Sequence, residues 1–333
     1  MNFITFQIIL VAILISLALS VPARKLSQRL RFLDIPGSEP HKSHGRPVPL
    51  AGGAVILLST AVTGLIFDMF SAFTVRTIFL SSMITFLFGL WDDIRELSLG
   101  WKFAGQLLAA TFLIWQGIGI RLFPQHPWLG VGLTYLWMVG ITNAFNFVDS
   151  MDGLANGLAV LAAAFFALGT AFSRQGDLFV LSATLVGAFA GTLFSTMPAA
   201  KLFLGDSGAQ YIGFILAGLA IEYSPEGLRT SQSWFVPILV LGVPIFDAVL
   251  VVYSRLRRGR SVFRAGHDHT YHRLVRLGLD SQRAVLAMHI TALLLGCIAF
   301  GTLLLPPLAG NAVFVAVLLA VFAGVIFLDK ERR

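Results

Sequence analysis

Long apolar runs recur along the whole chain, and they restrict its fold more than any other feature. A helix needs about 20 apolar residues to cross a bilayer, and about eleven stretches approach that length. They cover residues 3–22, 48–68, 72–91, 103–121, 128–148, 154–173, 177–197, 205–223, 234–254, 285–305 and 308–328. Only 12% of the 333 residues are charged, too few to cover a soluble fold of this size. The sequence therefore predicts an all-α, polytopic membrane protein that forms a single domain over residues 1–333.

The basic residues are distributed unevenly between the two sides of the predicted bundle. If the spans alternate, one side holds the loops 23–47, 92–102, 149–153, 198–204 and 255–284 and the C-terminus. That side has all but four of the 24 Lys and Arg residues. Because cytoplasmic loops are enriched in Lys and Arg, we expect a multi-pass protein of the plasma or inner membrane, with its N-terminus outside and its C-terminus in the cytoplasm. Membrane topology and contact with anionic lipid headgroups explain the excess of Lys and Arg residues, so no nucleic-acid partner is expected.

Acidic side chains gather at the span ends on this same side. They are Asp92 and Asp93 after the third span, Asp149 and Asp152 after the fifth, and Asp206 at the start of the eighth. Asn143 and Asn146 precede Asp149, and Asp247 lies within the ninth span. Ionisable groups near a membrane are expensive, so their convergence predicts a cytoplasmic-face active site. Helix capping is the alternative, and it would explain Asp93 or Asp206 singly but not five acids on one side.

These acids are suited to a hard divalent cation. The adjacent carboxylates Asp92 and Asp93 repel each other, which calls for a positive partner. Mg²⁺ prefers oxygen ligands and commonly combines one or two carboxylates with phosphates and water. The single cysteine, Cys297, excludes a thiolate zinc site. The sequence therefore predicts Mg²⁺ as the cofactor, with Mn²⁺ as a substitute.

Two basic loops contain the predicted phosphate contacts. The last one, in the sequence GHDHTYHRL, places His269 and His272 near Arg273. Zinc binding and a purely structural loop are alternatives, but arginine and protonated histidine form charge-assisted hydrogen bonds with phosphate oxygens. In the first basic loop, Lys42 and His44 are further candidates for substrate contact.

In order and spacing, these motifs resemble the polyprenyl-phosphate N-acetylhexosamine-1-phosphate transferases over about residues 33–286. The matching elements are KxH at Lys42 and His44, the pair Asp92 and Asp93, NAFNxxDxxDGLA from Asn143 to Ala155, GDSG from Gly205 to Gly208, PxxD from Pro244 to Asp247, and DHxxHRL from Asp268 to Leu274. The later motifs look more like the branch that uses UDP-N-acetylglucosamine than the muramyl-pentapeptide branch. Ser150, Ala209 and Tyr271 depart from the usual pattern.

The resemblance implies transfer of N-acetylglucosamine 1-phosphate from a UDP-sugar to undecaprenyl phosphate, with release of UMP, at the start of a cell-envelope glycan. It further implies that Asp206 and Asn146 bind the metal and that Asp92, Asp93 and Asp149 are the catalytic candidates. Substrate contacts are then expected from Lys102, Asn143, Asp152, His269 and His272.

Other classes of membrane protein remain as alternatives. A transporter or lipid flippase tends to place polar groups near the bilayer midplane and often shows internal repeats, whereas here the acids lie at one surface and no repeat is evident. A noncatalytic scaffold would not need the acid cluster. The expected partners are a UDP-N-acetylhexosamine, undecaprenyl phosphate and the lipid bilayer, and a homodimer is left open.

Overall fold

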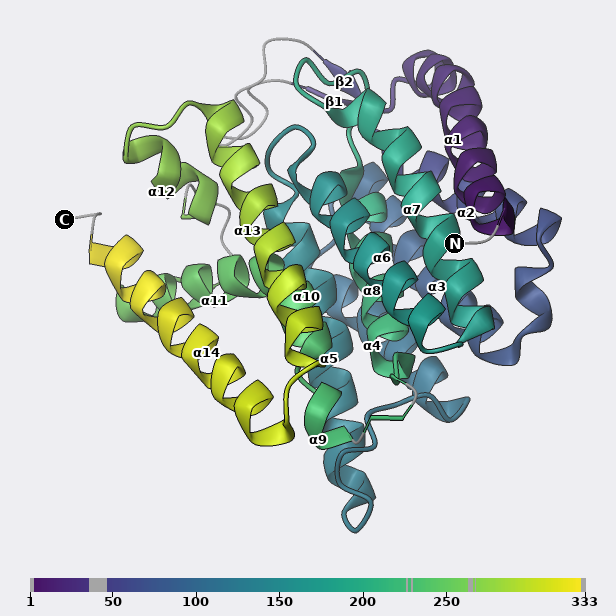
Figure 1. The fold of residues 1–333 in the computed structure, drawn as a ribbon. Coiled ribbons are helices and arrows are strands. Elements are labelled where there is room, and N and C mark those ends of the chain that lie inside the picture. The colour runs from purple at the N-terminus through teal and green to yellow at the C-terminus, as the bar shows by residue number, and fades with distance from the viewer. Residues whose placement is uncertain are drawn as a thin grey trace.

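The computed structural model describes residues 3–35, 47–225, 227–228, 230–262, 266 and 268–330, and helices dominate it (Figure 1). The strands within these residues are β1 (Leu33–Asp34) and β2 (Val48–Pro49). They pair antiparallel, with Leu33 opposite Pro49. The prediction of an all-α protein is confirmed.

A helix lies at each of the eleven stretches that were expected to span the membrane. In chain order the helices are α1 (Phe3–Arg29), α2 (Gly52–Ile66), the 3-10 helix η1 (Met69–Ser71), α3 (Phe73–Arg95), α4 (Leu99–Trp115), α5 (Pro127–Val148), α6 (Leu154–Phe172), α7 (Gly176–Thr196), α8 (Gly205–Glu222), α9 (Thr230–Ser233), α10 (Val236–Val240), α11 (Gly242–Arg257), α12 (Thr270–Arg276), α13 (Ser281–Thr302) and α14 (Pro307–Lys330).

Seven of the described helices are individually long and apolar enough to cross a membrane: α1, α3, α5, α6, α7, α13 and α14. Large apolar side chains such as Leu136, Leu294 and Leu319 lie exposed in the middle of these helices. Such an apolar surface is stable against lipid rather than water. The chain is therefore a polytopic membrane protein, while the count of about eleven crossings stays a prediction.

The ninth expected span, residues 234–254, is not straight. Residues Ser231–Val240 and Gly242–Arg257 form two helical segments that meet at an angle of 71°. Pro244 explains the break, because it has no N–H to donate to the carbonyl of Val240 and its ring would collide with that turn. The bend gives α11 a direction different from that of the segment before it.

Helix α8 forms the centre of the bundle (Figure 1). Every residue from Ser207 to Ala220 is buried, and α8 packs against α2, α3, α5 and α6. A helix that is apolar on all sides belongs in the interior. Its first turn, which contains Asp206, is therefore surrounded by the ends of several other helices.

Candidate active site

The start of α8 is capped by Asp93 of α3. Asp93 Oδ1 accepts a hydrogen bond from the N–H of Asp206 at 2.7 Å, and Oδ2 accepts one from the N–H of Ser207 at 3.1 Å. Amides in a first helical turn have no partner within the helix, and the helix dipole favours a negative charge there. Capping is thus what the Asp93 side chain does in the structure, and its part in catalysis stays a prediction.

Gly205 allows Asp93 to approach this closely. Its φ is +71°, a conformation that favours glycine, and a Cβ at this position would lie 2.6 Å from Asp93 Oδ2. The GDSG motif therefore needs its first glycine both for the backbone turn and for contact with the capping carboxylate.

The Asp206 side chain is bound by two other helices. Its Oδ1 accepts a hydrogen bond from Asn146 Nδ2 of α5 at 2.6 Å, and its Oδ2 lies 3.1 Å from Lys102 Nζ of α4. Lys102 Nζ also forms an ion pair with Asp92 of α3. The structure thus brings together five of the predicted site residues, because Asp93 lies against the same turn. One lysine faces several carboxylates, so the net charge of the cluster is negative and a further cation would stabilise it.

A second polar layer lies one helical turn deeper in the bundle. Asn143 Nδ2 donates to Gln106 Oε1 at 2.7 Å, and Gln106 Nε2 donates to Gln210 Oε1 at 3.4 Å. Gln106 follows Lys102 by four residues and Gln210 follows Asp206 by four, so each lies on the same helix face as its partner above. Neither glutamine was predicted from the sequence, although this four-residue spacing was the available signal. Asn143 supports the cluster from below, and its predicted substrate contact stays a prediction.

The loop between α5 and α6 lies beside this cluster. Asp149 is half-buried at the end of α5. Its burial, reinforced by the charges of Asp206, Asp93 and Asp152, raises its pKa well above the usual value. Asp152 Oδ2 accepts a hydrogen bond from the N–H of Ala200 at 3.2 Å, which joins this loop to the segment before α8. The expected contact of Asp152 with the nucleotide stays a prediction.

His269 is held by a carboxylate to which sequence analysis gave no role. Its Nδ1 lies 2.8 Å from Asp247 Oδ2 of α11, and Asp247 Oδ1 accepts a hydrogen bond from the N–H of Thr270 at 2.6 Å. Asp247 thus both orients the His269 imidazole and caps α12. The other ring nitrogen of His269, Nε2, is left for a ligand. The PxxD motif was visible in the sequence, but its histidine partner was not.

His272 and Tyr271 lie against the α5–α6 loop. Their rings pack against each other at a tilt of 32°, with centroids 3.9 Å apart. The Tyr271 hydroxyl lies 2.6 Å from His272 Nε2 and 3.4 Å from the carbonyl oxygen of Ser150. The His269 ring also contacts Phe147 of α5, with centroids 6.1 Å apart. These contacts place the two predicted phosphate-binding histidines next to the loop that contains Asp149. Burial raises the pKa of Tyr271 to about 12, so its hydroxyl stays protonated at neutral pH.

The arginines around this segment mostly face acids. Asp329, buried at the end of α14, lies 2.6 Å from Arg257, 2.7 Å from Arg258 and 3.5 Å from Arg273. Arg273 also donates to the carbonyl oxygen of Asp268 at 2.9 Å. Arg273 therefore anchors α12 to α14, and its expected part in phosphate binding stays a prediction.

The remaining candidates and the metal can be placed only in part. Lys42 and His44 lie outside the described residues. Among those described, no three His, Cys, Asp or Glu side chains are arranged as a metal site. Asp206 and Asn146 nevertheless lie side by side, with the amide nitrogen of Asn146 facing the carboxylate. Mg²⁺ commonly takes few protein ligands and completes its shell with phosphates and water, so one carboxylate and the Asn146 amide oxygen, turned toward the ion, would suit it.

Comparison with known proteins identifies the family. The model of glycosyl transferase family 4 matches residues 75–224, which include most of α3, all of α4 to α8 and the Asp206 cluster. Decaprenyl-phosphate N-acetylglucosaminephosphotransferase of Mycobacterium tuberculosis is 32% identical over 329 residues, covering 88% of this chain and 80% of its own. Undecaprenyl-phosphate alpha-N-acetylglucosaminyl 1-phosphate transferase is 32% identical over 262 residues in Thermotoga maritima, covering 78% of each chain, and 25% identical over 314 residues in Escherichia coli, covering 90% and 84%. The chain therefore belongs to glycosyl transferase family 4, the polyprenyl-phosphate N-acetylhexosamine-1-phosphate transferases that its motifs resemble.

Proposed function

We propose that this protein transfers N-acetylglucosamine 1-phosphate from UDP-N-acetylglucosamine to undecaprenyl phosphate. The relatives' names support both the sugar and a polyprenyl phosphate acceptor. The product is a lipid-linked pyrophosphoryl sugar that begins a cell-envelope glycan, and UMP is released.

The reaction exchanges one phosphorus–oxygen bond for another. An oxygen of the lipid phosphate attacks the β-phosphorus of the UDP-sugar, and the bond from that phosphorus to the bridging oxygen breaks. The bridging oxygen and the electron pair leave with UMP, so no oxidant or reductant is needed. The site has to position two anionic substrates and neutralise their charge.

The observation that supports this proposal is the position of Asp206, which meets residues from α3, α4 and α5 at the end of the central helix. In the proposal Asp206 and Asn146 hold Mg²⁺, which when bound neutralises the pyrophosphate charge. Lys102, already paired with Asp92 and Asp206, contacts a phosphate of the substrate.

The other predicted residues receive roles according to their surroundings. Asp92 and Asp149 position the lipid phosphate or accept its proton, whereas Asp93 positions Asp206 through the start of α8. His269 contacts phosphate through the nitrogen that Asp247 leaves free, and His272 lies beside it. Asp152 is assigned a contact with the nucleotide, and Asn143 a substrate contact from the layer that it forms with Gln106. For Lys42 and His44 the proposed role is contact with the substrate.

A donor panel tests the sugar and the acceptor together. The purified protein in detergent micelles is given undecaprenyl phosphate, Mg²⁺ and one of several UDP-sugars, and both UMP and lipid-linked product are measured. We expect UMP release with UDP-N-acetylglucosamine, and none when the lipid phosphate is omitted. Equal rates without the lipid would show simple hydrolysis, and turnover only with UDP-muramyl-pentapeptide would assign the chain to the other branch.

A further inference from the structure

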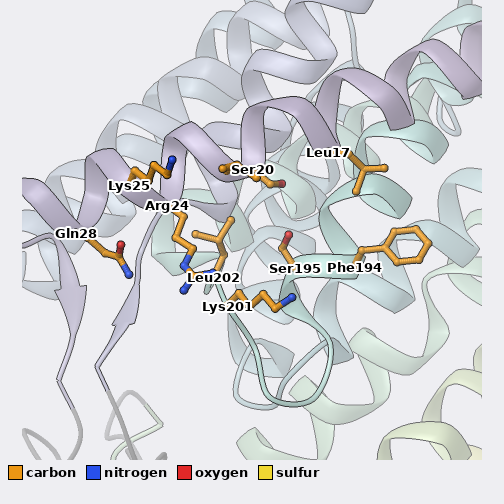
Figure 2. A pocket seen from close by; sticks show the side chains of 10 residues that line it. Leu17, Ser20, Arg24, Lys25, Gln28, Phe194, Ser195, Lys201 and Leu202 are labelled. Carbon is orange, nitrogen blue, oxygen red and sulfur yellow. The ribbon is translucent and has the colours of Figure 1, made fainter.

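A groove between α1 and the end of α7 has no role in the proposed reaction. Its cavity measures about 470 Å³. Figure 2 shows Arg24 extending from α1 toward Leu202 and Lys201, which lie on the segment that connects α7 to α8. The lining also includes Lys25 of α1. The apolar part of its lining includes Leu17, Val21 and Phe194.

The cationic part of the groove has no acidic counterpart. Arg24, Lys25 and Lys201 contribute three positive charges, and none of the lining residues is acidic. Within the described part of the chain, none of these three side chains forms an ion pair. Three unpaired cations around one cavity repel one another, so an anion bound among them would lower the energy of the site.

The apolar part lies on the membrane side of these charges. Leu17 precedes Arg24 by seven residues on α1, which corresponds to about 10 Å along the helix axis. Leu17, Val21 and Phe194 are all exposed, Phe194 to 68%. A ligand that fills the groove must therefore combine an anionic head with apolar chains that run toward the bilayer.

The groove is separate from the active site. It lies between α1 and α7, whereas α3, α4, α5 and α8 supply the side chains around Asp206. Its occupant would therefore be distant from the reacting phosphates. It would touch the segment that leads into α8, since Leu202 lines the groove and the next residue, Phe203, accepts a hydrogen bond from Gly52 at the start of α2.

We propose that this groove binds the phosphate headgroup of an anionic glycerophospholipid from the leaflet that the active site faces. Arg24 and Lys201 contact the phosphate, and the acyl chains lie along Leu17, Val21 and Phe194. The bound lipid fastens α1 to the segment that positions Asp206. This proposal does not depend on which sugar is transferred.

Lipid retention tests the proposal directly. The full-length protein is delipidated in detergent and titrated with phosphatidylglycerol or phosphatidylcholine, and bound lipid is counted by native mass spectrometry. We expect preferential binding of phosphatidylglycerol. The double variant Arg24→Gln, Lys201→Gln should weaken this binding about tenfold or more. Arg29→Gln is the matched control, because Arg29 is an exposed cation of α1 that does not line the groove.

Further measurements distinguish a phospholipid headgroup from inorganic phosphate and from undecaprenyl phosphate as the occupant of the groove. Phe194→Ser should also weaken phosphatidylglycerol binding, while millimolar inorganic phosphate should displace little of it. Equal binding by the wild type and the double variant, with both eluting as folded protein, would overturn the proposal. Full displacement by inorganic phosphate, or stronger binding of undecaprenyl phosphate through the same two cations, would also overturn it. None of these measurements requires transferase activity, so they are independent of the proposed function.

Discussion

Asp93 and Gly205 together determine how the first turn of α8, which contains Asp206, is held. Asp93 binds two backbone N–H groups at the start of α8, and Gly205 gives it the space to do so. The motifs predicted that Asp92, Asp93 and Asp206 belong to one site. They did not predict that Asp93 acts on the backbone of Asp206, because that contact depends on where α3 and α8 meet in space.

Gly205→Ala should reduce activity strongly while it lowers the stability of the protein only slightly. A left-handed alanine costs roughly 1–2 kcal/mol, and its Cβ would in addition push Asp93 away from the N–H of Asp206. We expect a small fall in melting temperature and a large fall in UMP release. Gly117→Ala is the control, because Gly117 has a φ of +85° and open space around it. Equal activity losses in the two variants would show that the Asp93 contact is unimportant.

Asp149 should make stability depend on pH. Its pKa is raised in the folded protein. Its contribution to folding stability is therefore present at low pH, where the carboxyl is protonated in both the folded and the unfolded state, and it is lost as pH rises through the folded pKa. Without divalent cations, Asp149→Asn should therefore melt at a higher temperature than the wild type at pH 8. The difference should disappear near pH 4. Thermal unfolding in EDTA measures it, and a less stable variant at pH 8 would show that the carboxylate is favourably paired.

Among the elements, the apolar runs predicted where the helices lie. They did not predict where the helices bend or which polar side chains meet between them. Helices formed at all eleven stretches because burial in lipid requires the backbone to bond within itself. The bend before α11 was missed, since residues 234–254 look continuous until the effect of Pro244 is considered. Gln106 and Gln210 were missed because glutamine is ordinary within helices, and only their meeting with Asn143 gives them a function.

The histidine segment should depend on the last helix. Asp329 binds three arginines, one of which belongs to α12. Asp329→Asn would leave the buried Arg273 guanidinium without its acid, a loss that costs about 3 kcal/mol or more. We expect faster trypsin cleavage between residues 255 and 276 and a higher KM for the UDP-sugar. Asp280→Asn is the control, because its ion pair with Arg283 is exposed and asparagine also caps helices. Unchanged cleavage in Asp329→Asn would contradict an anchoring role.

For the whole molecule, the distribution of charge predicts an orientation that labelling can test. With Cys297 replaced by serine, a single cysteine at Arg174 should react with a membrane-impermeant thiol reagent in intact cells. A cysteine at Arg283 should react only after the cells are permeabilised, since the positive-inside rule places this residue in the cytoplasm. The reverse pattern would invert the topology and place the Asp206 cluster on the outer face.

The most direct test of the proposed chemistry is UMP release by Asp206→Asn over a range of Mg²⁺ concentrations. Asparagine preserves the size of the side chain and can still contact Asn146 and Lys102, but it removes the charge that the proposed metal site needs. We expect the variant to insert and to fold, yet to release UMP only at background level at every Mg²⁺ concentration. Turnover near that of the wild type would show that Asp206 is not the centre of the site.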